Sequence, residues 1–445
     1  MVHARMKARR FIILAISILV FSCTPNLGPS EIPPENQLPT SKPVAIQEVS
    51  STPILTSTPN VLSEVRWNIY SPYPQHLWNR LFRQLYRRTT TDRREYGWDT
   101  LDPLLWYDTT YLLEETSYQE AISVLDEFLS AHGEELITDP LRRAIFQRDM
   151  WAVFDWLSLQ LDGYSSQRQE LQRRLAEVIR RVALTDDQIR SLPNNYEEGI
   201  NSKTFPTHYQ SKTPEINFLP SDLLQPDSGW VCLGREGGPI AMTHTEEFPF
   251  FGRSVFLVFV QVPGGRHATL KFLQGLNEKR PLTMQLADTD LALVRRALLI
   301  DDQGDLILSP ITESVQIRHF AYIGVNFTTQ YAYEFNFDRA FLFADAADSL
   351  KPISKEIMLF RSHGIDPFQM GFDVGEAGLP EICHTCHEEY GGGLTMSFLS
   401  FSRFRFPLPD QSSPLLIETI PEVEAQTVIN WKQKHETWQT FETFH

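Results

Sequence analysis

The stretch SVFLVFVQV, residues 254–262, is followed by Pro263-Gly264-Gly265. A short apolar run that is rich in β-branched and aromatic residues and closed by turn residues predicts a buried β-strand. Four further stretches have strand-like composition or alternation: 291–300, 306–308, 314–323 and 331–343. The first two flank the turn Asp301-Asp302-Gln303-Gly304 and predict a hairpin, while residues 266–276 predict a short helix. We therefore expect a mostly antiparallel β-rich domain over residues 206–350.

The region before this sheet, residues 63–205, carries helical signals. Helix N-terminus signals occur at three places: Ser117-Tyr118-Gln119-Glu120, Asp139-Pro140 and Thr185-Asp186-Asp187-Gln188. The run from Pro140 to Leu161 is apolar on nearly all its faces, which predicts a central, buried helix. Apolar residues three or four apart over 167–183 predict an amphipathic helix. These signals together predict an N-terminal helical domain.

The expected fold class is α+β: the helical domain comes first, then the mostly antiparallel β-rich domain, then a C-terminal segment over 351–445 with a helix starting near Pro421. The length of 445 residues allows about two or three domains. The 42% hydrophobic and 12% aromatic content excludes an intrinsically disordered chain. The formal net charge of −16 argues against a nucleic-acid partner, and four cysteines exclude a disulfide-stapled scaffold.

The first 22 residues have the layout of an export signal. Four basic residues open it: Arg5, Lys7, Arg9 and Arg10. The apolar run that follows, residues 11–21, is too short to span a bilayer as a permanent helix. It ends in Leu19-Val20-Phe21-Ser22-Cys23, which resembles the bacterial lipoprotein signal. The resemblance implies lipidation of Cys23 and an extracytoplasmic body that the lipid anchors to the cell membrane. The alternative is an ordinary cleaved signal peptide in which Cys23 has no role.

Residues 23–62 follow the signal and are rich in proline, serine and threonine. Residues 24–62 contain no aromatic side chain and eight prolines, so this segment cannot form a core and favours an extended chain. Treated as a flexible coil, it would span roughly 35 Å. We expect it to be a tether between the lipid and the body.

Cys383-His384-Thr385-Cys386-His387 fits the spacing C-x-x-C-H, the attachment signature of c-type haem. The motif resembles that of c-type cytochromes. The resemblance implies one haem c, with Cys383 and Cys386 as thioether attachment points and His387 as the proximal iron ligand. The exported location agrees with this, because haem is attached to apocytochromes outside the cytoplasmic membrane.

The residues of this motif also allow two alternatives to haem attachment. Cys383 and Cys386 could form a disulfide in an oxidising compartment. Zinc is the second alternative, held by Cys383, Cys386, His387 and the otherwise solitary Cys232 as a Cys₃His tetrahedron. Such a site would join the sheet domain to the C-terminal segment.

A bound haem would take its role from the sixth iron ligand. Met396 is the first choice for this distal ligand, because Gly391-Gly392-Gly393 could turn the chain back towards the iron. Met370 and His363 precede the motif. His435 lies with Trp431 and Trp438 on one face of the expected C-terminal helix, where a packing role is favoured.

Four other side chains are weaker candidates for chemistry. Asp149 and Asp155 could act as an acid/base pair, but they are six residues apart and a structural ion-pair role with Arg142, Arg143 and Arg148 is favoured. His244 and His319 are isolated in the sequence and have no ligand-spaced partner.

The sequence therefore predicts a membrane-tethered extracytoplasmic lipoprotein with one covalent haem. It would act in electron transfer or in haem-based redox chemistry or ligand binding, with a redox protein as its partner. The alternative is a non-enzymatic envelope lipoprotein, binding or structural, with a disulfide or a zinc staple at Cys383 and Cys386. Both hypotheses favour an electron carrier or a binding protein over an enzyme.

Overall fold

In the computed structural model, every described residue belongs to one compact unit within Ser57–His445. The described residues are 68–89, 95–98, 101, 110–158, 165–246, 250–278, 287–323, 328–344, 346, 349–353, 358–360, 376–378 and 414–444.

Helices lie before, between and after the strands of this unit. Their bounds are α3 (Leu77–Tyr86), α4 (Glu115–Ser130), α5 (Pro140–Leu157), α6 (Ser165–Arg181), α7 (Asp186–Arg190), α8 (Asn195–Asn201), α9 (Met242–Glu246), α10 (Gly265–Asn277), α11 (Arg339–Ala344), α14 (Pro421–Lys434) and α15 (Glu436–Glu442), with 3₁₀ turns at Thr110–Leu113 and Gly133–Glu135. Among these described helices, none is both long enough and apolar enough to cross a membrane.

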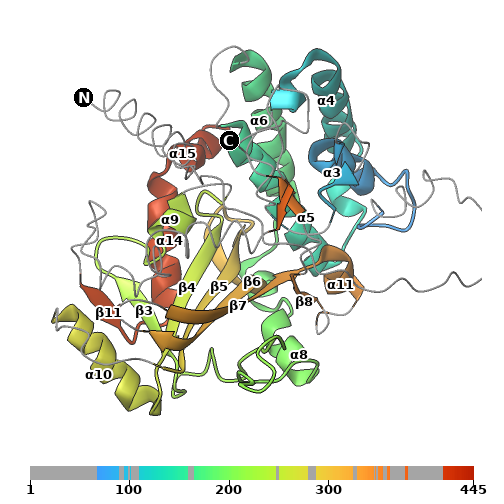
Figure 1. Ribbon diagram of the computed structural model, residues 1–445. Coiled ribbons are helices and arrows are strands. Elements are labelled where there is room, and N and C mark those ends of the chain that lie inside the picture. Colours follow the sequence, from blue (N-terminus) through green and yellow to red (C-terminus); the bar gives the residue numbers. More distant parts are fainter. Residues whose placement is uncertain are drawn as a thin grey trace, which may run out of the picture. The chain divides into compact units, whose positions relative to one another are not determined.

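Within the described residues, seven strands form one antiparallel sheet in the order β11-β3-β4-β5-β6-β7-β8. Their bounds are β3 (Val231–Arg235), β4 (Ser254–Gln261), β5 (Thr289–Ile300), β6 (Leu306–Ile323), β7 (Thr328–Phe337), β8 (Leu350–Pro352) and β11 (Leu415–Ile417). Two small antiparallel pairs lie outside it, β1 (Arg88–Thr89) with β2 (Glu95–Tyr96) and β9 (Met358–Phe360) with β10 (Glu376–Gly378). Helices first, an antiparallel sheet second and a C-terminal helix last confirm the predicted α+β class (Figure 1).

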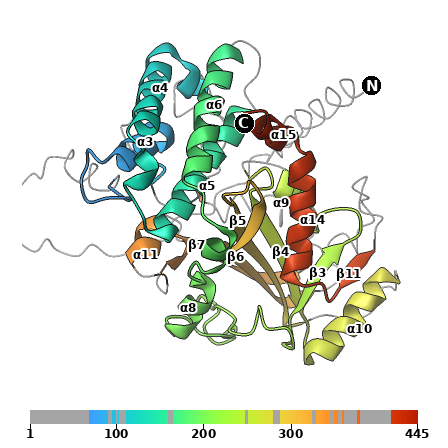
Figure 2. The same cartoon turned by 180° about the vertical axis from the view of Figure 1, so that it is seen from behind.

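Different helices cover the two faces of the sheet. Side chains alternate between faces along a strand, so Val231 and Leu233 pack with Leu273 of α10, whereas Cys232 joins the core that contains Val428 of α14. Helix α14 contacts β3, β4 and β6, and Figure 2 shows it lying across the strands. Helix α5 contacts β5 and belongs to the same large core as α14.

Helix α5 is the buried helix that the sequence predicts. The Asp139 side chain accepts a hydrogen bond from the Arg142 backbone N–H, and Pro140 occupies the first turn, as expected. Every residue from Ala144 to Leu157 is buried. The helix ends at Leu157, and residues 159–161 lie outside the described part of the chain.

Three charged side chains of α5 are fully buried, and their ionic partners come from distant elements. The Asp155 Oδ2 atom accepts hydrogen bonds from Arg253 Nη1 at 2.7 Å and from Lys432 Nζ of α14 at 2.6 Å. Arg339 of α11 pairs with Asp149. Glu313 of β6 pairs with Arg148, at 3.2 Å between Nη2 and Oε1.

The predicted structural role of Asp149 and Asp155 is thus confirmed, but two of the predicted partners, Arg142 and Arg143, were wrong. Arg142 donates to the carbonyls of Ile69 and Tyr70, and Arg143 donates to backbone carbonyls as well. Residues on one helix meet at spacings of three or four, and neither arginine has that spacing from its expected partner.

Two predicted boundaries also differ. The strand expected over 331–343 ends at Phe337, because the Asp338 carboxylate accepts from the Ala340 N–H and starts α11. Helix α4 starts at Glu115 rather than after Ser117, and no side-chain cap bond is formed at Glu114. The expected capping box at Thr185 and Gln188 is confirmed, as is the short helix after Pro263.

We predict that Asp155→Ala lowers the free energy of unfolding by about 3–5 kcal/mol, because it leaves Arg253 and Lys432 buried without their shared carboxylate. Chemical denaturation of the full chain, followed by tryptophan fluorescence, measures this. Asp186→Ala is the control, because it removes an exposed ion pair with Arg190 and should cost no more than about 1 kcal/mol. Equal effects of the two substitutions would contradict the role given to Asp155.

Candidate functional site

The residues that the sequence assigns to lipid and haem lie outside the described part of the chain: Cys23, Cys383, Cys386, His387 and Met396. His363 and Met370 lie outside it as well. The described strands nearest to the motif in sequence are β10 before it and β11 after it. Strand β11 pairs with β3, and the Thr419 N–H donates to the Cys232 carbonyl at 3.2 Å. The chain that follows the motif therefore returns to the sheet beside Cys232.

Cys232, the fourth ligand of the zinc alternative, is a buried free thiol under α14. Burial raises the pKa of this thiol to about 12, and the nearby carboxylates of Glu424 and Glu422 act in the same direction. Zinc is bound by the thiolate rather than the thiol. A zinc site at Cys232 would therefore require both a proton loss that its surroundings oppose and displacement of the covering helix.

Glu424, near Cys232, is a titratable group with a strongly shifted pKa. Its carboxylate is buried on α14 and accepts a hydrogen bond from the Ile240 backbone N–H at 2.7 Å. Burial raises its pKa to about 7, and the hydrogen bond from Ile240 acts in the opposite direction. This carboxyl group therefore changes charge near neutral pH.

A row of polar residues crosses four strands on the face of the sheet that carries the large core. The strand register places Gln261 opposite Asp290, Asp290 opposite His319, and His319 opposite Tyr331. Residues directly opposite on antiparallel strands point to the same face. The register alone thus gathers an amide, a carboxylate, an imidazole and a phenol that are far apart in the sequence.

The segment 205–222 covers this row. Tyr209 stacks on the His319 ring with 3.5 Å between ring centroids and 18° between planes. Phe218 packs edge-on against Tyr333, and Phe205 does the same against Phe335. Each aromatic pair stabilises the packing beyond the burial of apolar area. These rings therefore hold the segment on the sheet.

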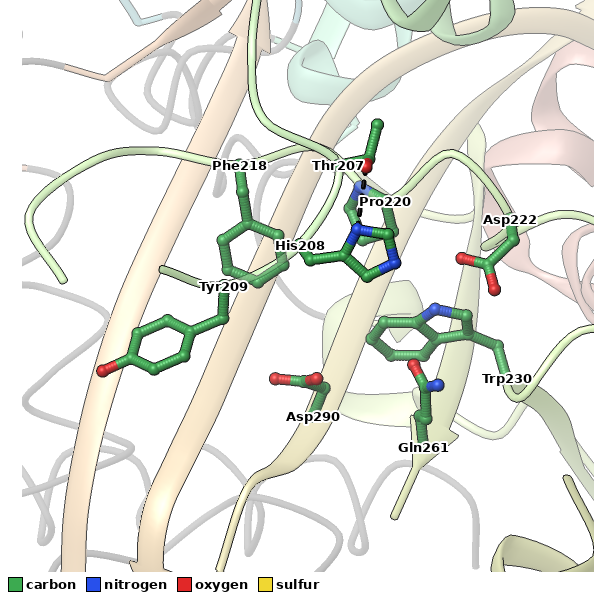
Figure 3. Close-up of a pocket in the computed structure, with 9 residues that line it drawn as sticks. All are labelled: Thr207, His208, Tyr209, Phe218, Pro220, Asp222, Trp230, Gln261 and Asp290. Carbon is green, nitrogen blue, oxygen red and sulfur yellow. Dashed lines mark hydrogen bonds between the residues drawn. The ribbon is translucent and has the colours of Figure 1, made fainter. Parts of the chain in front are cut away.

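A cavity of about 50 Å³ lies between the covering segment and the row. Trp230, Gln261 and Asp290 line it from the sheet side (Figure 3). The covering segment contributes Thr207, His208, Tyr209, Phe218, Pro220 and Asp222. The cavity is lined by two carboxylates, Asp222 and Asp290, and by no lysine or arginine. It therefore suits water or a small, positively charged group.

His319 is the one buried side chain of the row, because Gln261, Asp290 and Tyr331 are partly exposed. Its ring is 3% exposed, and its Nδ1 lies 2.7 Å from Asp290 Oδ1. A carboxylate only accepts hydrogen bonds, so Nδ1 carries the proton and Nε2 is left on the other side of the ring. Burial raises the pKa of Asp290, whereas the hydrogen bond from His319 opposes that rise.

His319 has no ligand-spaced partner along the sequence, and the structure brings it together with residues from neighbouring strands. Its partners Asp290 and Tyr331 stand on neighbouring strands, so no spacing along the chain reveals them. His244 is stacked on Phe256, and burial lowers its pKa to about 4. The packing role favoured for His435 is confirmed, because its ring lies 4.8 Å from that of Trp431. The single helix expected to carry Trp431, His435 and Trp438 was wrong: α14 ends before His435, whose Nδ1 accepts from the Thr437 N–H and caps α15.

Comparisons of the chain with models of known protein families, with curated protein sequences and with solved structures find no match.

We predict that Glu424→Gln makes stability less dependent on pH. A carboxyl group whose pKa is raised on folding contributes stability below its unfolded pKa of 4.5 and loses that contribution as pH rises through about 7. The amide can still accept from Ile240 and carries no charge, so the variant should be about 1–3 kcal/mol more stable than wild type at pH 8 and nearly equal at pH 5.

Urea denaturation at both pH values checks this prediction. Glu422→Gln is the matched control, because Glu422 is an exposed carboxylate on the same helix. A Glu424 variant that gains nothing at pH 8 would show that burial does not control this carboxyl group.

Proposed function

We propose that the protein is a membrane-tethered extracytoplasmic lipoprotein that holds one covalent haem c and acts in electron transfer or in haem-based ligand binding. The observation that carries the proposal is Cys383-His384-Thr385-Cys386-His387. At ordinary composition, a C-x-x-C-H pattern should arise by chance on the order of once in a thousand chains with this few cysteines. An export signal ahead of it directs the chain to the compartment where haem is attached.

Each residue of the motif has a defined task. The thiols of Cys383 and Cys386 would form thioether bonds with the porphyrin side groups, and the His387 imidazole would ligate the iron. When bound, the haem supplies one-electron redox chemistry. One motif provides for one haem, which fits the passage of single electrons to a redox partner protein.

Met396 is proposed as the distal ligand that would make this haem an electron-transfer centre. It follows His387 by nine residues, and three consecutive glycines, Gly391 to Gly393, lie between them. Thioether ligation by methionine raises the reduction potential of a c-type haem. An open sixth position would instead allow a small ligand to bind.

The buried state of Cys232 supports haem over the zinc alternative. A Cys₃His site needs four ligands, and Cys232 would have to be one of them because the remaining cysteine, Cys23, is proposed to carry the lipid. Its thiol pKa of about 12 and its cover by α14 oppose that role. A disulfide between Cys383 and Cys386 places no demand on Cys232.

We predict that the full chain, expressed in a host with cytochrome c maturation, carries haem that survives a denaturing gel. Cys383→Ala and Cys386→Ala should each weaken or abolish the covalent haem stain, and the double variant should show none. Cys232→Ser is the control and should keep the stain, because Cys232 takes no part in the motif. The spectrum of the reduced pyridine complex measures the haem directly.

A chain that folds but carries no haem would overturn the redox proposal. Zinc analysis and a thiol count on that protein would then decide between a metal site and a disulfide. Zinc that is lost in Cys232→Ser would favour the four-ligand staple, and two unreactive thiols without zinc would favour the disulfide.

We also predict that Cys23 carries lipid. Radiolabelled palmitate should be incorporated by the wild type and not by Cys23→Ser, because the lipid is attached to that thiol and to the new N-terminus. Cys232→Ser serves as the control and should be labelled normally. Labelling of the Cys23 variant, or none of the wild type, would contradict the anchor.

A further inference from the structure

His319 has one ring nitrogen that no described residue satisfies. Its side chain is 3% exposed, Nδ1 is bound to Asp290, and Nε2 has no hydrogen-bond partner in the described part of the chain. A buried polar atom without a partner costs about 1–3 kcal/mol. An orphaned imidazole nitrogen beside carboxylates therefore requires an explanation.

The group that faces Nε2 is the carboxylate of Asp288, with Oδ1 at 3.6 Å. This distance is too long for a hydrogen bond, whose normal range ends near ~3.2 Å. Two ligands that each lie about 2.0–2.1 Å from a tetrahedral zinc ion are about 3.3–3.4 Å apart. The observed separation exceeds that value by only a few tenths of an ångström, and the Asp288 side chain is 73% exposed and free to close it.

We propose that His319 Nε2 and the Asp288 carboxylate bind a divalent transition-metal ion of the zinc class, with Asp290 as the positioning residue behind His319. An imidazole and a carboxylate are ligands that zinc accepts. The carboxyl groups of Asp288 and Asp290 lie on either side of the ring, at Nε2 and Nδ1, so a cation bound at Nε2 would be surrounded by oxygen acceptors.

Asp290 supplies the outer contact that metal-ligating histidines nearly always have. Its Oδ1 accepts from Nδ1–H, which fixes the tautomer so that Nε2 presents its lone pair to the metal. The ring cannot turn away, because Tyr209 stacks on it and Tyr331 lies beside it on the neighbouring strand. The imidazole is therefore held in orientation before any ion arrives.

Because Asp288 is exposed, the proposed metal site is open to solvent. Two protein ligands leave the other coordination positions to water, so the ion would exchange with solvent rather than act as a permanent staple. This site differs from the motif at residues 383–387 and does not depend on the haem proposal. It also differs from the surface group His132, Glu134 and Glu135, whose ligand atoms lie within 4.8 Å of one another.

The test is isothermal titration of the full-length, metal-stripped protein with Zn²⁺, in the haem-loaded form and in a Cys383→Ser, Cys386→Ser background. We expect one equivalent to bind in both forms, because neither contains the motif thiols in a zinc-binding state. Co²⁺ added in place of Zn²⁺ should give the visible absorption bands of a four-coordinate ion.

The variants are chosen to leave the fold in place. His319→Asn keeps a donor near the Nδ1 position and removes Nε2, so the binding should be lost. Asp288→Asn should also lose it, and asparagine tolerates the left-handed backbone at this position, where φ is +53°. Asp290→Asn should weaken binding about 10–100-fold while leaving both ligands present.

His132→Ala is the control and should bind zinc as the wild type does. Zinc binding that persists in His319→Asn and Asp288→Asn but is lost in His132→Ala would overturn the proposal. So would NMR evidence that both ring nitrogens of His319 remain protonated in excess Zn²⁺, because His319 would then be an imidazolium between two carboxylates.

Discussion

The fold depends on three buried charged side chains of helix α5, each of which needs an ionic partner. Arg148, Asp149 and Asp155 are completely removed from water, and an unpaired charge in that position would be strongly destabilising. Their partners come from β6, from α11, from the turn before β4 and from α14. Packing α5 against the sheet therefore buries its charges together with partners from these four elements.

This constraint explains the position of the C-terminal helices. Lys432 of α14 is fully buried, and burial lowers its pKa to about 8 although the Asp155 carboxylate acts in the opposite direction. Its ammonium group bonds both Asp155 and the Thr437 hydroxyl of α15. One buried cation thus joins the end of the chain to the central helix, and Trp438 and Phe441 of α15 pack against Trp151 and Phe154 of α5.

Local patterns in the sequence predicted the helices and strands. They did not predict the contacts between residues that are distant in the sequence. The cap at Asp139, the buried strand from Ser254 and the helix starting at Pro421 were predicted because each signal lies within a few residues. The pairing of Asp149 with Arg339 joins positions 190 residues apart, and nothing in either neighbourhood points to the other. Asp338 is an ordinary N-cap residue and starts α11, but it lies inside the strand that the alternation predicts over 331–343.

The same limit applies to candidate sites. His319 looked isolated because its partners are set by strand register, which a single sequence does not display. The C-x-x-C-H motif is the opposite case, since the haem attachment proposed for it rests on five consecutive residues, which can be found without the fold. Sequence therefore suggested the chemistry of the C-terminal segment, and structure suggested the polar row on the sheet.

In the proposed protein, one polypeptide carries both a lipid at its N-terminus and one haem in its C-terminal segment. The most direct single measurement is the intact mass of the protein extracted from membranes of a host with lipoprotein and cytochrome c maturation. We expect the mass of residues 23–445 plus the lipid groups and one haem. The mass of the unmodified polypeptide, whether of the full chain or cleaved without lipid and haem, would contradict it.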